Sequence, residues 1–212
     1  MATSIEAEEH LRVIRSLMEK ATVYRAISAP TALVGGVTAL VAAGVVYWQT
    51  NGAAILTART NYLFLAVWLG ALLITGLANT YFLWRGAVER GDQFLSSGMR
   101  AALRALWPNY LVAGAVTILW AGSAQWLPAA WLLLYALGLL ATQHFAPRSM
   151  FYLGWAFLIA GLAALFFLVA PDSNLDGLGR LRAGNTIMGL TFGFLHLIYA
   201  ACIWSRKSGH GA

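Results

Sequence analysis

Six long apolar stretches that contain no Asp, Glu, Lys or Arg constrain this chain more than any other feature. Each spans about 17 to 23 residues, enough for a helix to cross the roughly 30 Å of hydrocarbon in a bilayer. An open strand would leave its backbone groups unpaired in lipid, and no stretch alternates polar and apolar residues. The sequence therefore predicts an all-α integral membrane protein, a six-transmembrane-helix bundle. The expected spans are Pro30–Trp48, Tyr62–Trp84, Tyr110–Trp126, Leu127–Gln143, Met150–Val169 and Ile187–Trp204.

The placement of Lys and Arg predicts the orientation of this bundle. Positively charged loops resist translocation, so the side richer in these residues is expected to be cytoplasmic. Three of them, Arg59, Arg180 and Arg182, fall on one side. The other side carries Arg12, Arg15, Lys20, Arg25, Arg85, Arg90, Arg100, Arg104, Arg148, Arg206 and Lys207. We therefore expect both termini in the cytoplasm, and the net charge of +6 indicates contact with anionic headgroups and no nucleic-acid partner.

Residues 1–28 precede the first span and are predicted to form a cytoplasmic or interfacial amphipathic helix, followed by the membrane domain at 29–205 and a tail at 206–212. Leu11, Ile14 and Met18 form its apolar stripe, and Arg12 and Arg15 accompany them. We favour a helix that lies along the membrane surface or the inner ends of the bundle. The alternative is docking to a soluble partner, helix in groove.

Two further patterns concern the arrangement of the helices. The cytoplasmic loop from Phe94 to Leu106 is amphipathic and is expected to lie at the interface. Pro30–Trp48 and Pro108–Trp126 align without gaps and share residues at seven positions, which raises the option of three related helical hairpins. Small residues on the spans predict close helix approach, within one subunit or in a homo-oligomer.

Polar residues in the spans gather toward the cytoplasmic half, and five of them are candidate ligand-binding residues. They are Asn79, Gln143, His144, His196 and Tyr199. They could line a shallow pocket for a small or lipophilic molecule. The interpretation we favour is that Asn79 and His196 make interhelical hydrogen bonds and that His144 lies in the headgroup zone.

No cofactor and no catalytic residue is expected. His144 and His196 differ too much in depth to ligate one haem, and no His, Cys or carboxylate cluster has the spacing of a zinc site. Asp172, Asn174 and Asp176 match the start of a calcium-binding loop, but the Glu that should close the loop is missing. We favour a simple turn that ends the fifth helix.

The segment from His10 to Ala21, the segment from Tyr24 to Gly36 and the segment from Phe192 to Tyr199 resemble uncharacterised six-helix bacterial inner-membrane proteins. The resemblance covers the two ends of the chain. It implies a bacterial plasma membrane and six helices, and carries no activity or site residue. The sequence thus favours a non-catalytic interaction, regulatory or accessory protein, with a carrier or receptor for a small or lipophilic molecule as the alternative.

Overall fold

The computed structural model describes residues 8–14, 29–91, 94–95, 97–143, 146–169 and 175–208, and all regular secondary structure in these ranges is helical. Six helical segments are long and apolar enough to cross a membrane, so the chain is a multi-pass helical bundle in a lipid environment. After a short helix at residues 8–14, the elements are α2 (Ala29–Thr50), α3 (Ala58–Arg90), α4 (Ser97–Leu119), the 3₁₀ helix η1 (Ala121–Trp126), α5 (Leu127–Ala141), α6 (Arg148–Val169), α7 (Gly177–Met188), the π-helix η2 (Gly189–Leu195) and α8 (His196–Ser208).

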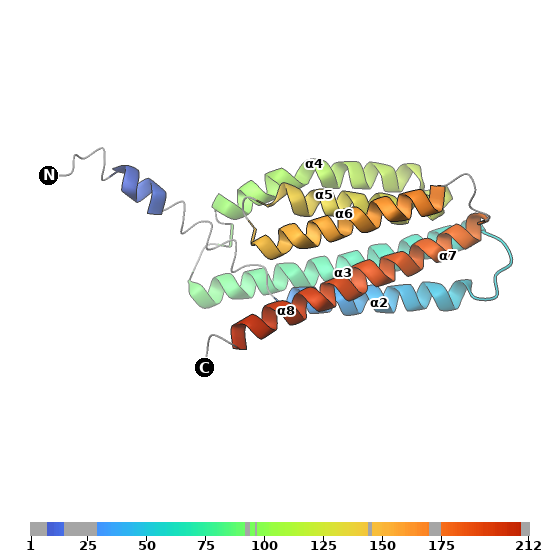
Figure 1. Ribbon diagram of the computed structural model, residues 1–212, viewed down its shortest axis with the longest axis horizontal. Helices are drawn as coiled ribbons and strands as arrows, with labels where there is room; N and C mark the ends of the chain where they lie inside the picture. Colours follow the sequence, from blue (N-terminus) through green and yellow to red (C-terminus); the bar gives the residue numbers. More distant parts are fainter. Residues whose placement is uncertain are drawn as a thin grey trace.

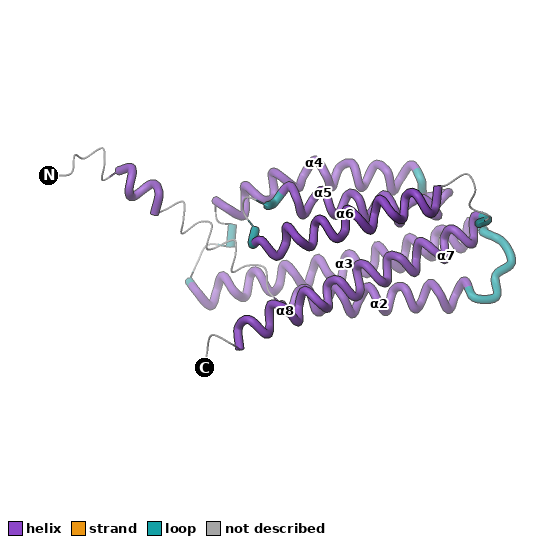
Figure 2. Tube along the Cα trace, viewed as in Figure 1, coloured by secondary structure: helices purple, strands orange, loops and turns teal. Residues whose placement is uncertain are grey.

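The bundle has two layers of roughly antiparallel helices (Figure 1). One layer holds α4, α5 and α6, and the other holds α3, α2 and the continuous helix α7–η2–α8. Helices dominate the trace, and the longest described connection is the loop at residues 51–57 between α2 and α3 (Figure 2). The helix at residues 8–14 and the end of α8 lie at one end of the bundle, which we call the amino-terminal side (Figure 1). The other end, with residues 51–57 and η1, is the far side.

The core consists of two clusters of buried side chains. One lies among α5, α6 and α8, around Leu132 and Phe157, and the other lies among α2, α3, η1 and α7, around Phe64 and Leu181. Phe192 of η2 packs against both clusters. The last helix therefore joins the two layers.

Local capping determines where two of the helices begin. Thr57 and Thr60 form a reciprocal capping box at the start of α3, in which each side chain accepts from the other's backbone N–H. Asp176 caps α7 by accepting from the Gly179 N–H at 2.6 Å. Because the caps lie ahead of the apolar stretches, α3 and α7 each begin with a polar first turn before the apolar residues start.

Several helices extend beyond the expected spans. Helix α4 runs from Ser97 through Pro108 to Leu119, so most of the stretch Phe94–Leu106, expected as an amphipathic loop, is the first part of a long helix. Residues 121–126 join the fourth span, because the chain leaves helical geometry at Ser123 (φ −134°, ψ 52°) and resumes it before Leu127. The last span begins at Gly177, ten residues before the expected Ile187.

The aligned segments of the suggested repeat have different structures. Pro30 lies in the first turn of α2, whereas Pro108 lies inside α4. Trp48 belongs to an α-helix and its counterpart Trp126 to a 3₁₀ helix. Helix α6 packs mainly against α5, and α8 packs mainly against α2, so the last two spans do not pair as a hairpin.

Candidate functional site

The last helix, α8, carries two of the candidate residues, His196 and Tyr199. The His196 ring lies between α5 and η2, where its Nε2 is 2.7 Å from the Tyr135 Oη. One turn later, the buried Tyr199 approaches α6, where the Ser149 hydroxyl donates to its Oη at 3.4 Å. His196 and Tyr199 thus connect α8 to two different helices.

The partners of His196 define the tautomer of its ring. Its Nδ1 lies 2.9 Å from the Phe192 carbonyl, which can only accept, so Nδ1 carries the proton. In the neutral ring Nε2 then accepts from the Tyr135 hydroxyl. Both ring nitrogens are satisfied within the protein, as a polar side chain inside a membrane requires.

Aromatic rings enclose this pair. Tyr135 makes edge contacts with Phe157 at 4.7 Å and with Phe192 at 5.0 Å between ring centroids. Phe192 also stacks on His196, with 13° between the ring planes. The wide turn of η2 lies directly before His196, and such π-turns occur often at functional sites.

The other candidate residues do not join this group. Asn79 is half-buried on α3, and its side chain makes no hydrogen bond to any described residue. Gln143 is exposed, just after the end of α5. His144 lies outside the described residues. Of the five candidate residues, His196 and Tyr199 share α8, and their hydrogen bonds go to separate partners.

Three asparagines that the sequence did not single out join helices to one another. Asn185 on α7 accepts from the Trp68 indole at 3.0 Å and donates to the Ala43 carbonyl at 2.9 Å. Asn61 donates to the Gly122 carbonyl at 2.7 Å, and Asn109 donates to the Leu134 carbonyl at 2.6 Å. Each lies within two residues of the expected start of a span. For Asn61 and Asn185 the signal was the capping pattern ahead of α3 and α7, which extends those helices past the apolar stretch.

Two arginines of α7 donate to carbonyls at the C-terminal ends of neighbouring helices. Arg180 donates from Nε to the Leu168 carbonyl of α6 at 3.0 Å, and its guanidinium lies 5.3 Å from the centre of the Trp126 ring. Arg182 donates to the carbonyls of Thr50 and Ala53 at the end of α2. A cation at a helix C-terminus pairs with carbonyls that have no intrahelical donor and with the negative end of the helix dipole.

The chain matches no protein-family model, no curated protein and no solved structure. Its chemistry must therefore be argued from the residues themselves.

The candidate metal ligands are only partly described. Within the described ranges, no three or more His, Cys, Asp or Glu side chains are grouped as a metal site requires. Asp176, from the candidate calcium loop, uses its Oδ1 to cap α7. Asp172 and Asn174 lie outside the described residues.

The structure also describes only some of the candidate docking residues. Leu11, Arg12 and Ile14 are exposed on the short helix at residues 8–14, with Leu11 65% accessible. Arg15 and Met18 lie outside the described residues. The helix at residues 8–14 lies outside the bundle, beyond its left-hand end in Figure 1.

Proposed function

We propose that this protein is a non-catalytic interaction, regulatory or accessory protein of the bacterial inner membrane. The observation that carries the proposal is the use of polar side chains in the bundle. His196, Tyr199 and Asn185 each bond a residue of another helix. Side chains that make such bonds stabilise the arrangement of the helices, which supports a structural use of these polar residues.

The proposed orientation places both termini in the cytoplasm. The described cations of the amino-terminal side include Arg100, Arg104 and Arg148, which are exposed or half-exposed. On the far side, Arg180 and Arg182 donate to carbonyls at helix ends. Among the described residues, the far side carries one further cation, Arg59. The orientation rule counts Lys and Arg on each side of the membrane, and the larger number on the amino-terminal side supports that side as the cytoplasmic one.

The amino-terminal helix is proposed as the interaction element. Leu11 and Ile14 are separated by three residues, so they lie on one helix face, whereas Glu9 lies on the opposite face. Val13 is exposed as well and lies nearer to Glu9. The exposed pair Leu11 and Ile14 supports helix-in-groove recognition by a protein partner.

Site-specific photo-crosslinking tests this proposal. A photoreactive amino acid is placed at Leu11 or Ile14, with Glu9 as the matched control on the same helix. We expect one discrete protein adduct from Leu11 and Ile14 and a much weaker one from Glu9. Adducts only to lipid, or equal adducts from all three positions, would reject the docking role.

A carrier or receptor for a small or lipophilic molecule is the second candidate, and the π-helix before His196 favours it. On this alternative, η2 would change its winding when a ligand displaces the Tyr135 hydroxyl from His196. Deleting residues 1–28 separates the two candidates, because it should abolish recruitment of a partner and leave ligand binding largely intact.

A further inference from the structure

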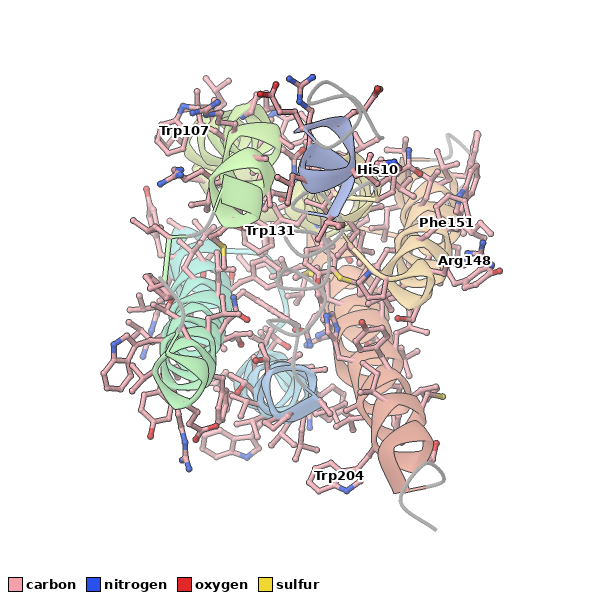
Figure 3. The ribbon with its side chains drawn as sticks, turned by 90° about the vertical axis from the view of Figure 1, so that its left-hand side faces the viewer. His10, Trp107, Trp131, Arg148, Phe151 and Trp204 are labelled. Atoms are coloured by element: carbon pink, nitrogen blue, oxygen red, sulfur yellow. The ribbon has the colours of Figure 1, made fainter. Side chains whose placement is uncertain are left out.

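Helix α4 presents two arginines and a tryptophan on one outward face. Arg100, Arg104 and Trp107 are separated by four and three residues, so their side chains lie in a row along the helix. All three are exposed, and Trp107 is 63% accessible. Figure 3 shows Trp107 on the outer side of α4, whereas Trp131 of α5 lies toward the interior.

The opposite face of α4 holds the helix in the bundle. Asn109 donates to the Leu134 carbonyl of α5, and the Trp131 indole donates to the Thr117 hydroxyl at 2.9 Å. These bonds fix the rotation of α4 about its axis. The row of Arg100, Arg104 and Trp107 must therefore face the surroundings of the protein.

The length of α4 places these cations close to the hydrocarbon. We take Leu119, the last residue of the helix, as the far edge of the hydrocarbon layer, which is about 30 Å thick. At 1.5 Å per residue, Arg104 and Arg100 lie about 23 Å and about 29 Å from Leu119 along the axis. Arg104 therefore begins inside the layer and must extend its side chain toward the headgroups to remain solvated. That direction brings its guanidinium toward Arg100.

The Arg104 side chain makes no hydrogen bond or ion pair with any described residue. The Arg100 guanidinium donates only to the Leu95 carbonyl among the described residues, at 3.2 Å. The one ion pair among the described residues joins Arg85 to Glu89 on α3. A cation at the edge of the hydrocarbon requires an anionic partner or water. The anion available at this depth in a bilayer is the phosphate of a lipid.

We propose that Arg100, Arg104 and Trp107 form a binding site for one anionic phospholipid in the leaflet of the amino-terminal side. The two guanidinium groups donate to the phosphate, a geometry that arginine suits better than lysine. The Trp107 ring lies below them at the level of the glycerol, where tryptophan is favoured. One acyl chain then lies along the exposed apolar side chains of the same face, Leu111 and Ile118.

This site does not depend on the proposed docking function, and titration with phosphatidylglycerol tests it. Native mass spectrometry of the detergent-solubilised protein measures the first bound lipid, with phosphatidylcholine as the zwitterionic comparison. Replacing both arginines, R100Q with R104Q, should weaken the first phosphatidylglycerol by roughly 30-fold, the effect expected for two cations at a membrane surface.

The matched control removes the same charge elsewhere. Arg59 lies on the far side and Arg148 at the start of α6, across the bundle from Trp107 (Figure 3). The pair R59Q with R148Q should leave the affinity within about threefold, because dispersed exposed charges are largely screened. A second variant, R104Q alone, should show an intermediate loss and guards against misfolding of the double variant. Equal losses from the two double variants, or equal binding of phosphatidylcholine, would overturn the proposal.

Discussion

Replacing Tyr135 with Phe tests the main polar contact of the last helix. The substitution removes one oxygen atom and keeps the ring that packs against Phe157 and Phe192. The His196 Nε2 then loses its donor, which lies 2.7 Å away. The ring cannot recover by changing tautomer, because Nδ1 would then face the Phe192 carbonyl without a proton.

The expected cost follows from two contributions. Interhelical hydrogen bonds in membrane bundles contribute about 0.6 kcal/mol on average and at most about 1.7. A buried acceptor left without a donor costs about 1–3 kcal/mol in proteins. We expect Tyr135→Phe to lower the free energy of unfolding by about 1–2 kcal/mol.

Unfolding in mixed micelles, titrated with sodium dodecyl sulfate and followed by tryptophan fluorescence, measures this change. Tyr152→Phe is the control, because Tyr152 is 69% accessible and makes no hydrogen bond to a described residue. Its stability should stay within about 0.5 kcal/mol of the parent protein, as for most exposed substitutions. If Tyr135→Phe and Tyr152→Phe unfold together, the hydrogen bond to His196 contributes nothing and the reasoning is refuted.

Two further predictions concern packing and helix ends, and the same unfolding titration measures both. Gly184→Ala should destabilise by about 1–3 kcal/mol, because a Cβ there would lie 2.5 Å from a proline ring carbon. Gly114→Ala, where a Cβ meets nothing within 4 Å, should be neutral or stabilising by up to about 1 kcal/mol; the reverse order would contradict the packing. Arg182→Gln should cost about 1–2 kcal/mol by releasing the carbonyls at the end of α2, and an unchanged stability would show that water replaces the arginine at no cost.

The number and type of the spans could be predicted from the sequence, because the length of an apolar stretch is set directly by the thickness of the bilayer. Hydropathy was a poor guide to where helices begin. It began three spans one or two residues after Asn61, Asn109 and Asn185, since an asparagine counts against an apolar window. Those residues lie inside the helices and bond neighbouring helices, which hydropathy cannot show.

Pro108 lies just before the expected start of the third span, Tyr110, and inside the helix that the structure shows. Pro108 is the twelfth residue of α4, which begins at Ser97, and its ring is exposed. A proline inside a spanning helix is tolerated when neighbouring groups compensate for the lost backbone bond.

The candidate site was predicted in part. The sequence placed His196 and Tyr199 among the polar residues of the membrane, and the favoured interpretation, an interhelical hydrogen bond for His196, is confirmed in the structure. Its partner Tyr135 could not be found from the sequence, because a tyrosine in an apolar helix is usually packing or an interfacial anchor. Asn79, paired with it in that interpretation, makes no such bond to the described residues.

Cysteine accessibility tests the central claim, a bundle that crosses the membrane six times with its amino-terminal side in the cytoplasm. Cys202, the chain's one cysteine, is replaced with Ser, and a single cysteine is introduced at Ala54 in the far-side loop or at Gln143 after α5, both exposed. A membrane-impermeant maleimide applied to intact bacteria should label Ala54→Cys and reach Gln143→Cys only after permeabilisation. Labelling of both positions in intact cells would contradict the spans between them, and the opposite pattern would contradict the orientation.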